Sequence, residues 1–467
     1  MTKCVPHRNH SSRNKATAFL AGLLFVLPCA LQAGEGSESL PSRPLSLHDC
    51  IAIALGESPA LEASRYDIAA AAEEARAAQG FALPQLSGTA SAEIFSGEPT
   101  GKFQVVNAGD VTGVGLSTSK SVNLEAVDVF TAKLRYPLFK DGSILGLNNP
   151  PAVAEKKAKK QAAAWTLHLR REEVIYRITD SFIATVSALN RTDFVQRRVS
   201  LLEQSVGITQ EQQKQGLALP IDVKVAQDQL TGARSLAKIL REQAVAGEYE
   251  MARLLGLPAS SKVRLVNTLP DPPDPPSAEE ILGASLNQHP SLQVQRAVID
   301  QAKQKYRLER FRLYPSVSLD GSLIYIDDFN PPGANVYTGA VTVNVPIFDF
   351  GAQLATARSK MMTYRAEQAR LLSVADDVTY EVLKTYQEIY VLGQNILSLQ
   401  DEVSKTERDL RVAASQREQG IAEPLTTIEK ELHFIAKRDD LEGLQARRLT
   451  LFANLQRAVG GAWKWIP

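Results

Sequence analysis

Two hydrophobic periodicities alternate along the chain, and the changes from one to the other mark its predicted elements. In four stretches apolar and polar residues alternate with a period of two, which predicts β-strands with one apolar and one polar face. These stretches are 86–94, 130–136, 317–325 and 337–345. We interpret them as the centres of strands of about ten residues, the length at which a tilted strand crosses a hydrocarbon core. The alternation fits a barrel wall, and it equally fits two soluble hairpins that cover a helical core.

Helical periodicity fills the rest of the chain. A helix over 47–81 precedes the first strand pair and one over 278–313 precedes the second. Ser46 and Ser277 can cap these helices, because each is followed three positions later by an acidic residue. After each strand pair the helical pattern runs much further. No proline occurs over 352–418, so a single helix of about 100 Å is possible at 1.5 Å per residue.

A heptad pattern within this stretch predicts that the long helix packs against another helix. Its positions step alternately by three and four residues, and only Thr406 interrupts their apolar character. They are Ile389, Leu392, Ile396, Leu399, Val403, Thr406, Leu410 and Ala413. A glycine turn then leads into a second helix, over 221–255 in the first half and 425–459 in the second. The sequence thus predicts two long antiparallel helical hairpins.

Three short landmarks occur twice, in the same order, and indicate an internal duplication. They are Ser58-Pro59-Ala60-Leu61 with His289-Pro290-Ser291-Leu292, 231 residues apart; Pro137 to Gly142 with Pro346 to Gly351, 209 apart; and Gln215 to Pro220 with Gln419 to Pro424, 204 apart. We therefore predict a first repeat over 34–269 and a second over 277–460. A stiff proline-rich linker over 270–276 joins them, and 461–467 forms a short tail.

The first 33 residues have the layout of a secretory signal peptide, with a basic start, a short apolar run and small residues at the end. A lipid anchor at Cys29 is not expected, because Pro28 stands where a small, cleavable residue is needed. Without this segment Cys50 is the remaining cysteine, and we predict it to be a small core residue. The later chain has no apolar stretch long enough for a helical span, which leaves a soluble periplasmic protein or a β-barrel.

Charge and motifs narrow the classes of function. Without the four basic residues of the predicted signal peptide, 48 Lys and Arg stand against 52 Asp and Glu, a net charge of −4. This balance argues against nucleic acid as a partner. The chain lacks the phosphate-loop, zinc-protease and nucleophile-elbow motifs, and His48, His168, His289 and His433 have no metal-ligand spacing. We therefore predict no enzyme activity, cofactor or metal, and any transport must draw its energy from a partner.

Four strands are too few for a closed barrel, since the smallest known barrels need about eight. An open sheet in lipid would leave backbone groups unpaired, at several kcal/mol for each group. Three copies would supply twelve strands and a wide lumen. The predicted fold is thus an α+β membrane protein, in which the strands of a homotrimer form a twelve-stranded barrel and the coiled-coil hairpins form a helical tunnel.

These features resemble the TolC-like outer-membrane efflux protein (OEP) family. The resemblance rests on the doubled element order, on the Pro-[Leu/Ile]-Phe-x-x-Gly motifs at 137–142 and 346–351, and on the glycine turns, and it covers 45–460. It implies a trimeric channel in the outer membrane of a Gram-negative bacterium, continued by a periplasmic tunnel. Such a channel is the exit duct of a tripartite efflux or type I secretion system. The implied partners are a periplasmic adaptor, an inner-membrane pump of RND, ABC or MFS type, and outer-membrane lipid.

The resemblance also implies roles for single residues. The adaptor-contact tips are Gly216, Leu217, Ala218, Gly420, Ile421 and Ala422; the periplasmic gate and constriction comprise Asp222, Arg417, Thr426 and Glu429; the strand-to-helix junctions are Pro137, Gly142, Pro346 and Gly351. Family members have an acidic residue where Thr426 stands and a basic one where Ala422 stands. Any lock at Asp222 must therefore use another basic partner, for which Arg417 is the candidate; the alternative is that both side chains are solvated charges at the tips. The insertion 147–151, absent from the second repeat, should delay the start of the first long helix.

An exported coiled-coil scaffold without a channel is the alternative function. It would account for the heptads and the export signal. It would not account for alternating strands at matched places in both repeats.

Overall fold

The fold was obtained as a computed structural model, which describes residues 43–93, 104–108, 111–115, 127–258, 261, 263–272, 275–326 and 334–465. Contacts divide the chain into two units, 1–43 and 44–467, and every element named below belongs to the second. The predicted signal peptide and Cys29 lie outside the described residues.

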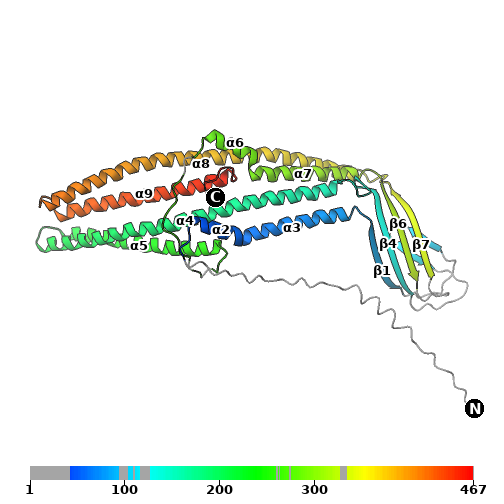
Figure 1. The fold of residues 1–467 in the computed structure, drawn as a ribbon, viewed down its shortest axis with the longest axis horizontal. Helices are drawn as coiled ribbons and strands as arrows, with labels where there is room; N and C mark the ends of the chain where they lie inside the picture. The colour runs from blue at the N-terminus through cyan, green and yellow to red at the C-terminus, as the bar shows by residue number, and fades with distance from the viewer. Residues whose placement is uncertain are drawn as a thin grey trace, which may run out of the picture. The chain divides into compact units, whose positions relative to one another are not determined.

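The helices and strands follow one order twice (Figure 1). The first half contains α2 (Leu47–Glu57), α3 (Pro59–Gly80), β1 (Gln85–Glu93), β2 (Gln104–Ala108), β3 (Val111–Gly115), β4 (Val127–Lys140), β5 (Ser143–Ile144), α4 (Pro151–Lys214) and α5 (Pro220–Leu254). The second half contains α6 (Ala278–Gln288), α7 (Pro290–Phe311), β6 (Ser316–Ile326), β7 (Ala334–Asn344), α8 (Ala352–Glu418) and α9 (Pro424–Ala458).

The predicted strands form one antiparallel sheet with the order β1-β4-β6-β7. Its register places Leu86, Leu134 and Gly321 side by side across three strands. The next row belongs to the opposite face, where the Arg135 Nε donates to the Asp320 carboxylate at 2.8 Å. Apolar and polar residues therefore occupy different faces, as their alternation predicted.

Two features of the strands were not predicted. The loop between the first two predicted strands contains a small hairpin, in which β2 pairs with β3. At the end of β4 the register shifts by one residue between Pro137 and Phe139, and the two-residue strand β5 pairs with β4 beyond the shift. A proline cannot donate to the ladder, so a bulge at Pro137 is a place where the sheet tolerates it.

The helix predicted over 47–81 is wrong in its continuity, because it is two helices separated at Ser58. The helix over 278–313 is likewise broken at His289. Each break precedes a proline, which lacks a backbone N–H and clashes with the preceding turn inside a helix but suits the first helical position. The predicted capping boxes are present, with Asp49 and Glu280 as their acidic members.

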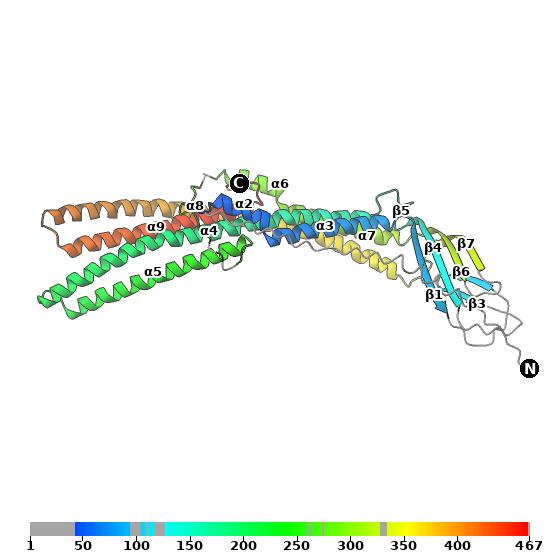
Figure 2. The same cartoon turned by 60° about the horizontal axis from the view of Figure 1, so that its bottom comes forward.

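The two predicted long helical hairpins are α4–α5 and α8–α9, and the ends of α5, α8 and α9 lie within one residue of their predicted positions. Helix α8 runs without interruption for 67 residues and α4 for 64. In the heptad seam Ile389 and Ile396 are buried, and so is Thr406, whose hydroxyl donates to the Val403 carbonyl at 2.9 Å. Both hairpin tips lie at the end of the helices opposite the sheet (Figure 2).

The two hairpins are joined by a polar seam between α4 and α9. Arg191 of α4 holds the Asp439 carboxylate of α9 with two hydrogen bonds, at 2.6 and 3.0 Å. Further along, Arg197 pairs with Glu431 at 2.6 Å. Such bidentate contacts between guanidinium and carboxylate fix the position of one helix along another more strictly than apolar contacts do.

An apolar cluster lies where the second repeat meets the tail. It joins α6, α8 and α9, and partly buried Trp463 and Trp465 of the tail pack against it. Its buried members are Ile281, Val378, Val382, Ile389, Phe452, Leu455, Ala458 and Val459. The Trp465 backbone N–H donates to the Gln456 side-chain oxygen at 3.1 Å, which fixes the tail to α9.

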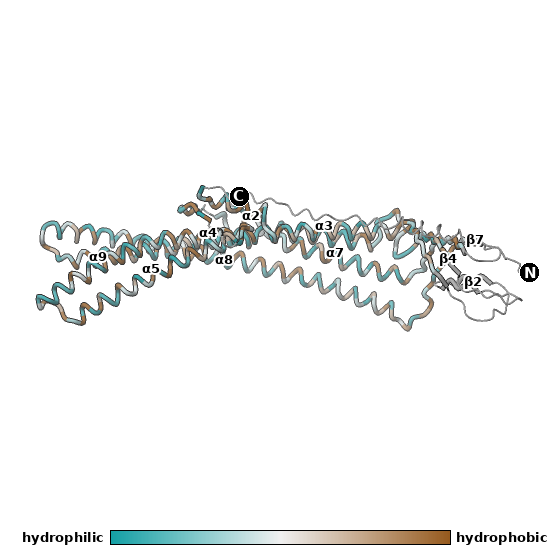
Figure 3. The backbone as a smooth tube through the Cα atoms, turned by 90° about the horizontal axis from the view of Figure 1, so that it is seen from below, coloured by the Kyte–Doolittle hydropathy of each residue, from teal (hydrophilic) through white to brown (hydrophobic). Residues whose placement is uncertain are grey.

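Cys50 on α2 is fully buried, and this burial raises the pKa of its thiol to about 12. It is therefore a small protonated core residue, as predicted. Apolar and polar residues are interspersed along all the described helices (Figure 3), and none of those helices is long and apolar enough to cross a membrane.

His289 links the start of α7 to the end of α9. Its Nδ1 accepts the Ser291 backbone N–H at 3.1 Å, so the neutral ring carries its proton on Nε2, which lies 3.1 Å from the Ala458 carbonyl oxygen and donates to it. Burial of the ring lowers the pKa of His289, and the charge of Arg457 acts in the same direction.

We predict that His289 makes the fold sensitive to acid. The unfolded chain takes up this proton near the ordinary pKa of about 6.5, whereas the folded chain takes it up at a lower pH. The stabilisation is therefore complete above about pH 6.5 and declines as the pH falls toward the folded pKa. Melting temperatures measured by circular dichroism from neutral to mildly acidic pH should fall less in His289→Asn, which keeps a capping acceptor. Equal slopes in both proteins would contradict this role.

Candidate functional site at the hairpin tips and strand junctions

The two hairpin tips have the same backbone geometry. Gly216 and Gly420 adopt positive φ angles of 77° and 76°, which a glycine tolerates without strain. After each glycine the chain folds back, and the N–H groups of Leu217 and Ile421 donate to carbonyls of the preceding turn at 2.8 Å. This is the usual hydrogen-bonded end of a helix at a glycine. It leaves Leu217 75% and Ile421 71% exposed, and the first tip also exposes Leu219 and Ile221.

The predicted gate residues lie near the tips but do not meet within one chain. The Asp222 carboxylate accepts the Leu219 N–H at 2.8 Å and so caps the start of α5. Arg417 is exposed in the last turn of α8. Among the ion pairs of the described residues, none joins these two side chains. Thr426 and Glu429 are exposed on the first turns of α9.

The first strand-to-helix junction is tightly packed. Gly142 has a φ of 81°, and a Cβ atom added to it would lie 2.6 Å from the ring of Phe311 on α7. Pro137 is also buried. The predicted delay of the helix is present, because α4 begins at Pro151, whereas α8 begins directly after Gly351.

Asn148, within the insertion, has a structural role that the sequence analysis missed. Its Nδ2 donates to the Gly142 carbonyl at 2.7 Å, and its Oδ1 accepts the Ile144 N–H at 3.0 Å. One amide side chain thus fixes the turn between β4 and β5. The only sequence signal was the run Asn148-Asn149-Pro150-Pro151, which predicts a turn but does not identify its hydrogen-bond partners.

The second strand-to-helix junction has a similar turn but is packed much less closely by other residues. Gly351 also has a φ of 81°, and no atom lies within 4 Å of an added Cβ. Asp349 accepts the N–H groups of Gly351 and Gln353 at 2.9 and 2.7 Å, which caps α8. Phe348 and Phe350 contact each other with ring centroids 4.6 Å apart, and both are mostly exposed.

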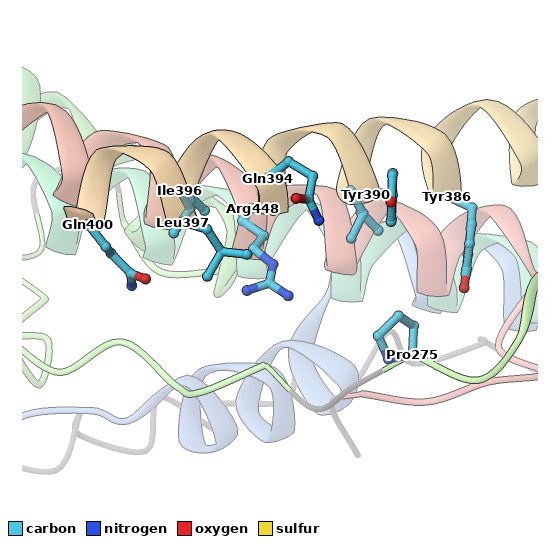
Figure 4. A pocket seen from close by; sticks show the side chains of 10 residues that line it. Pro275, Tyr386, Tyr390, Gln394, Ile396, Leu397, Gln400 and Arg448 are labelled. Carbon is cyan, nitrogen blue, oxygen red and sulfur yellow. The ribbon is translucent and has the colours of Figure 1, made fainter. Parts of the chain in front are cut away.

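A shallow pocket of about 360 Å³ lies on α8 beside the linker (Figure 4). Its lining consists of Pro275, Tyr386, Ile389, Tyr390, Gly393, Gln394, Ile396, Leu397, Gln400 and Arg448. Arg448 reaches it from α9, with its guanidinium 5.4 Å from the centre of the Phe452 ring. The Arg448 Nε is buried without a hydrogen-bond partner in the described part of the chain. No group of three or more metal-binding side chains occurs among the described residues.

The chain is similar to known proteins in both sequence and fold. Residues 281–461 match the family model of the outer membrane efflux proteins. The structure superimposes on the outer membrane protein VceC of Vibrio cholerae with a TM-score of 0.69 at 18% identity, over 89% of this chain and 96% of that one. The resemblance to TolC-like outer-membrane efflux proteins is confirmed. The likeness to VceC extends this fold to the first repeat, which the family model does not cover.

Two curated relatives are similar in sequence. The pyoverdine export outer membrane protein OpmQ of Pseudomonas aeruginosa is 21% identical over 306 residues, 62% of this chain and 61% of that protein. The outer membrane protein TolC of Vibrio cholerae is 23% identical over 239 residues, 48% of this chain and 54% of that protein. The chain thus spans less than two thirds of the length of either relative.

We predict that alanine is tolerated differently at the two junction glycines. Gly142→Ala and Gly351→Ala share the cost of an alanine at positive φ, about 1–2 kcal/mol. Only Gly142→Ala also forces the Phe311 ring to move, which adds about 1–3 kcal/mol. Denaturant unfolding of the two variants should therefore show the larger loss of stability for Gly142→Ala.

Phe311→Ala provides the control, because it removes the ring that the new methyl group meets. Combined with Gly142→Ala, it should abolish the extra cost, so that the double variant is more stable than the sum of the single effects predicts. Strict additivity would show that the ring is not the cause.

Proposed function

We propose that this chain is the outer-membrane exit duct of a tripartite efflux or type I secretion system. The duct is a passive homotrimer, whose sheet lies in outer-membrane lipid and whose helices extend into the periplasm. A periplasmic adaptor opens it, and an inner-membrane pump of RND, ABC or MFS type supplies the energy.

One observation carries this proposal: a four-stranded antiparallel sheet continues directly into two helices of 64 and 67 residues. The outer edges of β1 and β7 have no strand partner within the described residues. A sheet in lipid must be closed, because each unpaired backbone group there costs several kcal/mol. Strands from further copies can close it, and the attached helices then surround the same axis and continue the lumen.

The hairpin tips are the proposed docking surface for the adaptor. Leu217 and Ile421 stand exposed on tight glycine turns, a geometry that suits insertion of an apolar side chain between the helices of a partner. Gly216, Ala218, Gly420 and Ala422 permit close approach of the partner because their side chains are small or absent.

We expect the protein to behave as a membrane-embedded trimeric channel. After membrane fractionation it should require detergent for extraction from the outer membrane and should have the mass of three chains in light scattering. In planar bilayers it should give a small, stable conductance, since the gate is closed without the adaptor. Recovery as a soluble monomer or dimer would instead support the exported scaffold.

For the gate we propose that Asp222 of one copy pairs with Arg417 of another, with Thr426 and Glu429 lining the constriction. Since Asp222 also caps α5, Asp222→Ala would remove two functions together. Asp222→Asn keeps an oxygen for the Leu219 N–H and removes the charge. It is therefore the sharper variant.

We predict that Asp222→Asn and Arg417→Gln each raise the closed-state conductance in planar bilayers. The double variant should add little to either single change, because both remove one ion pair. Additive increases, or no increase in either single variant, would show that the two residues do not form the lock.

A further inference from the structure

The sheet has two open edges, one on β1 and one on β7. β1 and β7 each pair on one side only within the described residues. Their apolar side chains are open, with Leu86 76% and Val343 57% exposed. An unpaired, apolar edge is a template for another strand, and in lipid it must find one. The internal duplication makes it possible to specify that pairing residue by residue.

The duplication preserves strand register. β1 pairs with β4 so that Gln85 faces Arg135, and β6 pairs with β7 so that Ser316 faces Asn344. Adding 231 to the number of the β1 residue and 209 to that of the β4 residue converts the first pair into the second. The same conversion holds for all the β1–β4 pairs from Gln85 to Glu93. The offsets read from sequence are therefore also structural equivalences.

The chain contains one joint between its repeats, formed by β4 and β6. There Arg135 faces Asp320 and Leu134 faces Gly321. Beyond Pro137 the register shifts by one, so that Phe139 faces Val317. In the duplicated scheme β7 corresponds to β4, and β1 corresponds to β6.

From these equivalences we propose that β7 of one copy pairs antiparallel with β1 of a second copy in the register of the β4–β6 joint. Asn344 then faces Thr89, and Val343 faces Ala90 of the second copy. Beyond Pro346 the same shift brings Phe348 opposite Leu86. This joint rests on the proposed trimeric duct and specifies how its subunits meet.

Exposure supports this assignment. Phe348 is 76% exposed, whereas its counterpart Phe139 in the internal joint is partly covered. Leu86 is 76% exposed, whereas its counterpart Val317 is partly covered. Phe348 and Leu86 are thus exposed in the single chain, whereas the equivalent residues in the β4–β6 joint are partly covered.

Side-chain parity also supports this register. Val343 and Ala90 both belong to the apolar face of the sheet, and Asn344 and Thr89 both belong to the polar face. A slip by one residue would bring the apolar face of one strand against the polar face of the other. A slip by two keeps parity, so experiment must distinguish it. Where the β4–β6 joint has the Arg135–Asp320 ion pair, the proposed joint has the neutral pair Asn344 and Thr89 at the equivalent positions.

Disulfide trapping in the intact trimer tests the register. The double variant Thr89→Cys/Asn344→Cys should form covalent dimers and trimers on mild oxidation of outer membranes, seen on non-reducing gels. The controls Ser87→Cys/Asn344→Cys and Ser91→Cys/Asn344→Cys represent slips by two on the same face, and they should cross-link several-fold less. Native Cys50 is fully buried and can remain in all variants. Each single cysteine variant measures the background of cross-linking through that one cysteine.

The outcomes separate this joint from the proposed function. If a slipped pair cross-links as well as Thr89 and Asn344, or better, the register is wrong. If the protein is trimeric and no pair cross-links, β7 and β1 do not meet. A monomer in detergent would overturn the trimeric duct itself, and the joint with it.

Discussion

Backbone hydrogen bonding at the edges of a small sheet is the constraint on which the rest of this structure depends. In the four-stranded sheet β4 and β6 form backbone hydrogen bonds on both sides, whereas, within the described part of the chain, β1 and β7 each form them on one side only. Water could solvate those edges, but lipid cannot. The proposed closure by further copies would pair both edges, and Leu86 of β1 and Val343 of β7 are exposed in the single chain.

The helices meet a different requirement, because they must hold a fixed position against one another over many turns. Apolar packing alone tolerates sliding, whereas the pairs Arg191–Asp439 and Arg197–Glu431 fix α4 against α9 at defined heights. Apolar contacts accompany these pairs, because Leu201 of α4 packs against Ile428 and Ile435 of α9. The ion pairs therefore set the position of α4 along α9, and the buried apolar side chains hold the two helices together.

Much of the fold could be predicted from local pattern, because period and punctuation are local properties. The alternation at 317–325 placed β6, and the proline-free stretch at 352–418 predicted α8 to the residue. The break between α2 and α3 at Ser58 was not predicted, because the helical pattern continues on both sides of it. Pro59 was the signal for this break. The candidate site was less accessible. The glycine turns could be located, but the hydrogen bonds of Asn148 and the contact of Gly142 with Phe311 join residues that only the fold brings together.

The unbroken course of α8 has a mechanical consequence. A single helix of 67 residues connects the strand junction at Gly351 with the tip at Gly420. It has no proline to absorb bending, and Asp349 fixes its first turn. A stiff rod of about 100 Å is a lever: a tilt of about 5° at the sheet end displaces the tip by about 9 Å. A small rotation at the sheet end and a large displacement at the tip are thus one and the same motion of this helix.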